Sequence, residues 1–226
     1  MMFKGVGIFY LLFFTISIVL AIFPFLDSAF TSIFYRGNNQ FVVQHYLVSI
    51  FHFYEFIIRD LFMPLIVVVI LFLPIILKFS NFLKNKLNIF DLKIDEIIYV
   101  WMSALSVVIV VNSLKTFWGR ARPVDTVIFE GDKILTSWIT YSNECLSNCS
   151  FVSGDASVGF FIACLYYLNK NIKVLYISIL FGLIIGFVRI GAGAHFLSDI
   201  LMSFVVVNLV LTMVYGMFSK WIFKKT

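Results

Sequence analysis

The chain has 226 residues and a formal net charge of +5, and 62% of its residues are hydrophobic. Charged residues make up 13%, about half the share that is usual in soluble domains, and the mean hydropathy is +1.02. These values exclude an ordinary soluble protein and predict an all-α, polytopic membrane protein. The length suits a single domain over residues 1–226, with about six spans of roughly 20 residues each.

Apolar runs long enough to cross a bilayer recur along the chain. The first resembles a signal peptide, but it extends through Phe25 and no small-residue cleavage site follows, so we expect a retained span. The fourth run is short, and flanking residues would have to lengthen it. The six expected spans are 6–26, 57–77, 97–114, 156–168, 174–189 and 200–218.

If successive spans cross the membrane in opposite directions, the positive residues fall into two groups, one on each side. One group follows the positive-inside rule and predicts cytoplasmic ends: Lys4, Lys78, Lys84, Lys86, Lys93, Lys170, Lys173, Lys220, Lys224 and Lys225. The other group lies on the outer side, against the usual bias, which indicates a function there: Arg36, Arg59, Lys115, Arg120, Arg122, Lys133 and Arg189. The basic charge therefore indicates membrane orientation, and we expect no nucleic-acid partner.

The segment from about 40 to 60 is apolar but carries polar residues on one helical face. His45, His52, Glu55 and Arg59 share that face. We interpret the segment as an interfacial helix that leads into the second span, with its polar stripe toward water.

Three polar motifs interrupt the apolar sequence. They are Lys115-Thr-Phe-Trp-Gly-Arg-Ala-Arg-Pro (115–123), Ser-Phe-Val-Ser-Gly-Asp (150–155) and Arg-Ile-Gly-Ala-Gly-Ala-His-Phe-Leu-Ser-Asp (189–199). Six spans place both termini inside and all three motifs on the outer side. We therefore expect the motifs to converge on one surface.

The third motif contains a histidine and a carboxylate four residues apart. On one helix, His195 and Asp199 would lie within hydrogen-bond reach, so that Asp199 fixes the imidazole tautomer for nucleophilic attack. The alternative is a helix-capping pair without catalysis.

The cations and the second motif are typical of a phosphate site. Lys115, Arg120, Arg122 and Arg189 would neutralise phosphoryl oxygens, unless they serve as anchors for lipid headgroups. Ser153-Gly154 would direct backbone N–H groups of a helix N-terminus toward an anion. An ordinary N-cap explains the same pair.

The three cysteines give little sign of a metal site. Cys145 and Cys149 lie four residues apart in a polar loop without the further ligands that zinc requires, and Cys164 lies in an apolar run. A loop disulfide and two free thiols both remain open. We expect no metal and no other cofactor.

Together the motifs resemble the signature of the type-2 phosphatidic acid phosphatase (PAP2) superfamily, Lys-x6-Arg-Pro, Pro-Ser-Gly-His and Ser-Arg-x5-His-x3-Asp. Six positions of the first and third motifs match at the family's spacing: Lys115, Arg122, Pro123, Arg189, His195 and Asp199. Val188 replaces the family's Ser, Val152 its Pro and Asp155 its His. The run 150–157, with its cysteine pair, is similar to bacterial lipid A phosphatases, most closely to the 4′-phosphatase branch.

The resemblance implies a six-helix bundle and metal-independent phosphoryl transfer through a phosphohistidine. His195 would be the nucleophile and Asp199 its orienting partner. The groups expected to bind the phosphate are Lys115, Arg122, Arg189, Ser153 and Gly154, with Arg120 as a further candidate. Asp155 stands where the family has its general acid. The proton could come from a protonated Asp155 or from His45 or His52, or the leaving group could need little help.

We therefore expect a lipid phosphatase of the bacterial inner membrane, with a site open to the periplasm and a preference for the 4′-phosphate of lipid A. Hydrolysis of undecaprenyl pyrophosphate and phosphoryl transfer to another lipid are the enzymatic alternatives. An inactive protein that binds or transports lipid phosphates is the alternative of another class. Substrate and membrane lipids are the expected partners, and the oligomeric state is left open.

Overall fold

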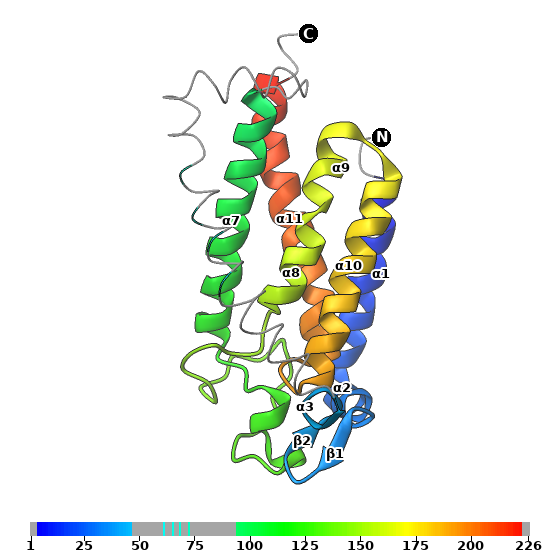
Figure 1. Ribbon diagram of the computed structural model, residues 1–226, viewed down its shortest axis with the longest axis vertical. Helices are drawn as coiled ribbons and strands as arrows, with labels where there is room; N and C mark the ends of the chain where they lie inside the picture. Colours follow the sequence, from blue (N-terminus) through cyan, green and yellow to red (C-terminus); the bar gives the residue numbers. More distant parts are fainter. Residues whose placement is uncertain are drawn as a thin grey trace.

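Long apolar helices form the part of the chain that this computed structural model describes: residues 4–46 and 94–222, with the single positions 61, 65, 68 and 72. The helices run side by side, and most of the described connecting loops lie at one end of the bundle (Figure 1). The all-α membrane fold expected from the sequence is confirmed.

Four described helices are long and apolar enough to cross a membrane. They are α1 (Lys4–Ile22), α7 (Ile94–Trp118), α10 (Ile172–Gly191) and α11 (Leu197–Ile222). Each contains or overlaps a predicted span. The predicted span 156–168 consists of two consecutive helices, α8 (Gly154–Phe161) and α9 (Ala163–Asn169). The predicted span 57–77 and most of the predicted interfacial helix lie outside the described ranges, so the total of six spans stays a prediction.

Helix α11 is the centre of the bundle. It contacts α1, α7, α8, α9 and α10, and 67% of its apolar stretch is buried, compared with 22% of that of α1. Its inward side chains join the main hydrophobic cluster, in which Phe204 packs edge-on against Phe13 and Phe160. The position of a residue at the start of α11 is therefore fixed by the packing of this helix against its neighbours.

Helices α8 and α10 pack closely because glycines face each other at their contact. A Cβ atom added to Gly159 would lie 2.7 Å from the Cα atom and from the backbone nitrogen of Gly182. Small residues of this kind let membrane helices approach until their backbones touch. The contact fixes the position of α8, whose first residues belong to the second polar motif.

A small cap of secondary structure covers the loop end of the bundle. It consists of α2 (Pro24–Ser32), the hairpin β1 (Tyr35–Gly37) and β2 (Gln40–Phe41), α3 (Val42–Tyr46), and the short 3₁₀ helices η2 (Pro123–Asp125) and η3 (Val127–Phe129). Pro24 starts α2 immediately after α1 ends, because proline suits the first turn of a helix but not its interior. Phe41, Phe129 and Phe196 form the buried core of the cap.

The three polar motifs lie at this same loop end (Figure 1). The turn between α9 and α10, with Lys170 and Lys173, lies at the opposite end, where α1 begins and α11 ends. The expected convergence of the motifs on one surface is therefore confirmed.

We predict that Gly159→Ala destabilises the bundle by about 1–3 kcal/mol, because the added methyl group would overlap the backbone of α10. Thermal unfolding in detergent measures the effect. Gly216→Ala is the matched control, since a Cβ atom there meets nothing within 4 Å, and alanine should stabilise α11 by up to ~1 kcal/mol. Equal effects of the two substitutions would contradict the proposed close contact.

Candidate active site

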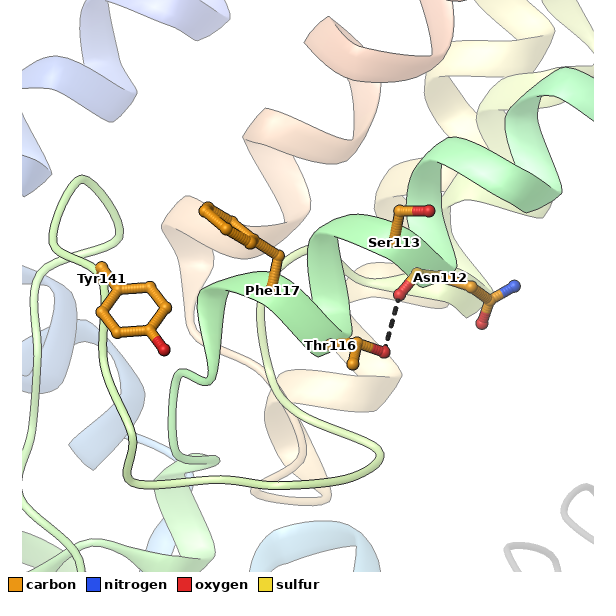
Figure 2. A pocket seen from close by; sticks show the side chains of 5 residues that line it. All are labelled: Asn112, Ser113, Thr116, Phe117 and Tyr141. Atoms are coloured by element: carbon orange, nitrogen blue, oxygen red, sulfur yellow. Dashed lines mark hydrogen bonds between the residues drawn. The ribbon is translucent and has the colours of Figure 1, made fainter.

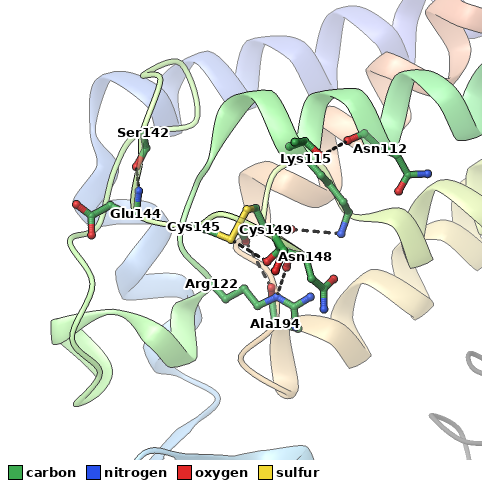
Figure 3. The surroundings of a disulfide bond; sticks show 12 residues. Asn112, Lys115, Arg122, Ser142, Glu144, Cys145, Asn148, Cys149 and Ala194 are labelled. Carbon is green, nitrogen blue, oxygen red and sulfur yellow. Dashed lines mark hydrogen bonds between the residues drawn. A yellow bond between two sulfur atoms is a disulfide. The ribbon is translucent and has the colours of Figure 1, made fainter.

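The end of α7 and the loop that follows it place two cations of the first motif. Lys115 lies in the last turn of α7, and its Nζ atom donates a hydrogen bond to the carbonyl oxygen of Cys149 at 3.2 Å. Nε of Arg122 donates to the carbonyl oxygen of Asn148 at 2.8 Å. Gly119, with φ +61°, follows the last residue of α7 and lies between them. Figure 3 shows both cations directed at the same short loop.

That loop is closed by a disulfide between Cys145 and Cys149, with a Cα–Cα distance of 5.5 Å (Figure 3). Of the two alternatives that the sequence left open, the structure contains the disulfide. Cys164 is a buried free thiol. Within the described ranges, no three or more His, Cys, Asp or Glu side chains gather as they would around a metal ion.

The second motif forms the N-terminus of α8. Ser153 is its N-cap, and its Oγ atom accepts a hydrogen bond from the backbone N–H of Ala156 at 3.3 Å. The capping alternative is therefore present, and the N-terminus that it creates is also the expected anion site. Gly154 faces Lys115: a Cβ atom there would lie 3.6 Å from Cε of the lysine and 3.9 Å from Nζ.

Asp155 and Arg189 form an ion pair that joins α8 to α10. Nε of Arg189 lies 2.9 Å from Oδ2 of Asp155, and the Arg189 side chain is buried whereas that of Asp155 is one-fifth exposed. Asp155 therefore neutralises one of the expected phosphate-binding cations.

His195 and Asp199 are close but not hydrogen-bonded. Nδ1 of His195 lies 3.9 Å from Oδ2 of Asp199 and has no hydrogen-bond partner. The spacing argument required both residues to be in one helix, but α11 begins at Leu197, after the histidine. Oδ2 of Asp199 accepts instead from the backbone N–H of Phe196 at 2.9 Å, as in a capping box, and from Oγ of Ser150 at 2.6 Å.

Arg120 binds two buried carboxylates. It is 1% exposed, its Nη1 donates to Oδ1 of Asp199 at 2.6 Å, and its Nη2 donates to Oδ2 of Asp27 at 3.0 Å. Its Nε donates to the carbonyl oxygen of Thr136, and its guanidinium lies over the ring of Phe196. These partners are all groups of the protein, and the substrate contact expected of Arg120 stays a prediction.

The environment of His195 favours its neutral form. The side chain is buried, and Lys115, Arg189 and Arg122 lie near it, so burial and then these positive charges lower the pKa of His195 well below 6.5. A neutral imidazole retains the lone pair that a nucleophile needs.

Sequence reasoning missed Asp27, Ser150 and Ser198. Each is fully or almost fully buried. Oγ of Ser198 donates to Oδ2 of Asp27, its backbone N–H donates to Oδ1 of Asp27 at 3.1 Å, and its Oγ accepts from Arg120 at 2.8 Å. Ser150 was quoted within the second motif, so the sequence held a signal for it. No local pattern marked Asp27, which lies 93 residues from Arg120.

An open groove of about 630 Å³ lies on α7 and beside the loop that follows it (Figure 2). Its lining consists of Asn112, Ser113, Thr116, Phe117 and Tyr141. The two aromatic rings lie 5.6 Å apart, and the hydroxyl of Thr116 donates to the carbonyl oxygen of Asn112 at 3.1 Å. Figure 3 shows Asn112 on the same end of α7 as Lys115.

This arrangement has the parts that phosphoryl transfer requires. A neutral histidine lies among three cations, next to a helix N-terminus, and a buried carboxylate faces one of its ring nitrogens. Cations and N–H groups stabilise the charge on the transferring phosphoryl oxygens, and the imidazole supplies the nucleophile.

Comparison with known proteins agrees with this chemistry. Residues 96–223 match the PAP2 superfamily. The chain is 32% identical over 205 residues to "Lipid A 4′-phosphatase" of Francisella tularensis subsp. novicida (strain U112), which covers 87% of each chain. No solved structure matches the chain.

Two shorter matches carry the same description. The chain is 36% identical over 93 residues to "Lipid A 4′-phosphatase" of Rhizobium leguminosarum, which covers 40% of each chain. It is 40% identical over 94 residues to that of Rhizobium etli, which covers 38% of this chain and 35% of the relative.

We predict that Gly154→Ala leaves thermal stability unchanged but weakens the binding of inorganic phosphate by about tenfold or more. The new methyl group makes ordinary contacts with Lys115, yet it occupies the space between the lysine and the helix N-terminus. Calorimetric titration with phosphate measures the affinity. Val158→Ala, at an exposed position of the same helix, is the control. Wild-type affinity in Gly154→Ala would show that phosphate does not lie there.

Proposed function

The chain belongs to the PAP2 superfamily and is a lipid phosphatase, and we propose that it removes the 4′-phosphate of lipid A through a phosphohistidine at His195. The observation that carries the substrate proposal is the match to a lipid A 4′-phosphatase over 87% of the chain. The geometry around His195 supports the mechanism.

In the first step, His195 attacks the phosphorus atom of the phosphate monoester. Because Nδ1 faces Asp199, we assign the attack to Nε2. Its lone pair forms the N–P bond while the bond from phosphorus to the sugar oxygen breaks, and that oxygen leaves with the electron pair and takes up a proton. Lys115, Arg122 and Arg189 neutralise the phosphoryl oxygens. In the second step, water attacks phosphorus and gives a proton to the carboxylate of Asp155. The N–P bond breaks, its electron pair returns to His195, and inorganic phosphate leaves.

Asp155 is our proposed proton donor to the leaving oxygen. In the empty site its carboxylate is paired with Arg189 at 2.9 Å. An incoming phosphate dianion competes for that guanidinium and repels the carboxylate, so we expect substrate binding to separate Asp155 from Arg189. The alternative donors His45 and His52 have side chains outside the described part of the structure.

The groove on α7 supports a substrate with a sugar headgroup. An amide, two hydroxyl groups and two aromatic rings are suited to the hydroxyls and apolar faces of a sugar ring. Asn112 of the groove and Lys115 lie on the same end of α7, and we propose that a sugar held in the groove presents its phosphate to the cations. A glycolipid uses both parts of this surface, whereas a simple glycerol phosphate uses the cations alone.

The chain is a multi-pass membrane protein, and we place its site on the periplasmic side of the bacterial inner membrane. Two observations support this orientation. The Cys145–Cys149 disulfide beside the site belongs in an oxidising compartment. Lys170 and Lys173 lie at the opposite end of the bundle, where the positive-inside rule places cytoplasmic residues.

We predict that the purified protein removes one phosphate from lipid A and that His195→Ala abolishes this turnover while it leaves folding intact. Mass spectrometry of the lipid measures the loss, and fragmentation gives its position. Leu146→Ala, 88% exposed in the disulfide loop, is the matched control. Because burial and nearby cations lower the pKa of His195, the wild-type rate should fall on acidification only below pH 6.5.

Other outcomes of this experiment identify the alternatives. Loss of the 1-phosphate would overturn the positional proposal alone. Turnover of undecaprenyl pyrophosphate but not lipid A would overturn the substrate, and transfer of the phosphoryl group to a second lipid would replace hydrolysis. Turnover by His195→Ala would remove the covalent mechanism. Tight binding without phosphate release from any lipid would favour the inactive binding protein.

We predict that Asn112→Ala combined with Thr116→Val raises KM for lipid A by about tenfold and leaves KM for a short-chain phosphatidic acid within about twofold. The substitutions remove hydrogen-bonding groups from the groove and leave Lys115 in place. Ile109→Ala, exposed on the same helix but outside the groove, is the control. An equal rise for both lipids would show that the groove does not recognise the sugar.

A further inference from the structure

Asp27 lies inside the candidate active site although it comes from outside the region that matches the family. The family match begins at residue 96, and Asp27 belongs to α2. Its side chain is 0% exposed. Oδ2 accepts a hydrogen bond from Nη2 of Arg120 at 3.0 Å, and Oδ1 accepts from the backbone N–H of Ser198 at 3.1 Å. The N-terminal segment therefore contributes a buried carboxylate to the site.

Arg120 lies between two carboxylates, and together these three groups set the net charge next to His195. Asp27 and Asp199 each bind one terminal nitrogen of the guanidinium. With all three groups ionised, the cluster carries one net negative charge. Without the charge of Asp27, Arg120 and Asp199 would cancel each other.

The pKa of Asp27 lies above its usual value, and its direct partners limit that rise. Burial raises the pKa of Asp27, and the nearby Asp199 acts in the same direction. The Arg120 charge and the two hydrogen bonds from Ser198 oppose that rise. A guanidinium shared between two carboxylates also needs both of them to balance the cost of burying its own charge and donors.

We propose that Asp27 is a positioning residue of the phosphatase site: it binds the far side of Arg120, so that Asp199 keeps a net negative charge directed at His195. Attack on phosphorus turns the neutral imidazole of His195 into a cation, and this charge stabilises it. The inference rests on the proposed function of His195. It adds a residue to the site and does not depend on which lipid is the substrate.

The charges around His195 make the sign of the effect testable. The described groups that face it or act on it through a neighbour come from several elements: Lys115 on α7, Arg120 and Arg122 after α7, Asp155 on α8, Arg189 on α10, Asp199 on α11 and Asp27 on α2. Removing one negative charge from this set lowers the pKa of His195, and removing one positive charge raises it.

The experiment compares the pH dependence of kcat/KM for three variants, Asp27→Asn, Arg120→Gln and the double variant. Asp27→Asn should lower kcat about tenfold with little change in KM, and it should move the acid limb of the profile to lower pH by about half a unit or more. Arg120→Gln should move the limb to higher pH. The double variant keeps the net charge of wild type, so its limb should return toward the wild-type position even where its rate stays low.

If Asp27 and Arg120 only supported the fold, their two variants would not shift the acid limb of the pH profile in opposite directions. If Asp27→Asn does not fold, Arg120→Gln and Asp27→Glu carry the test, since the glutamate should keep the wild-type limb. Ser28→Ala is the control, because that hydroxyl donates to the carbonyl oxygen of Phe25 and not to this cluster. Active variants with an unmoved acid limb would overturn the role of Asp27. A wild-type protein that hydrolyses no phosphate monoester would overturn the proposed function instead.

Discussion

The buried guanidinium of Arg120 is the interaction on which the loop end of the protein depends. It joins the loop after α7 to α2 through Asp27 and to α11 through Asp199, at 3.0 and 2.6 Å. A buried ion pair gains little over an apolar contact, but the loss of one partner leaves an unpaired charge at a cost of about 3–5 kcal/mol. Three distant segments are thus held together by groups whose single exchange lowers stability.

Helix α11 transmits this arrangement to the anion-binding end of α8. Oγ of Ser203 donates to the carbonyl oxygen of Ser153 at 3.0 Å and to that of Asp199 at 2.7 Å. The N-cap of α8 and the carboxylate behind the histidine therefore share one neighbour. Because α11 is packed from several sides, the distance between them is set by the core of the bundle and not by the connecting loops alone.

The spacing of polar residues predicted the parts of the site that lie close in sequence. Lys115, Arg122, Arg189 and His195 were found because each motif keeps its groups within a few residues. The partner of Arg120 could not be found in this way, since Asp27 lies 93 residues away. The expected hydrogen bond between His195 and Asp199 is absent because helix α11 starts between the two residues. The start of the helix depends on capping contacts, such as the one from Phe196 to Asp199, and the spacing of residues in the sequence does not reveal them.

The place of the site along the bundle has a consequence for how a lipid reaches it. The motifs lie where the membrane-spanning helices end and not at their middle (Figure 1). A lipid could therefore bring its headgroup to His195 while its acyl chains stay in the bilayer. Binding then requires no cavity that shields a whole lipid from water, and no energy is spent on extracting the lipid from the bilayer. Encounter then becomes a two-dimensional search, in which substrate density within one leaflet, and not concentration in solution, sets the rate of binding.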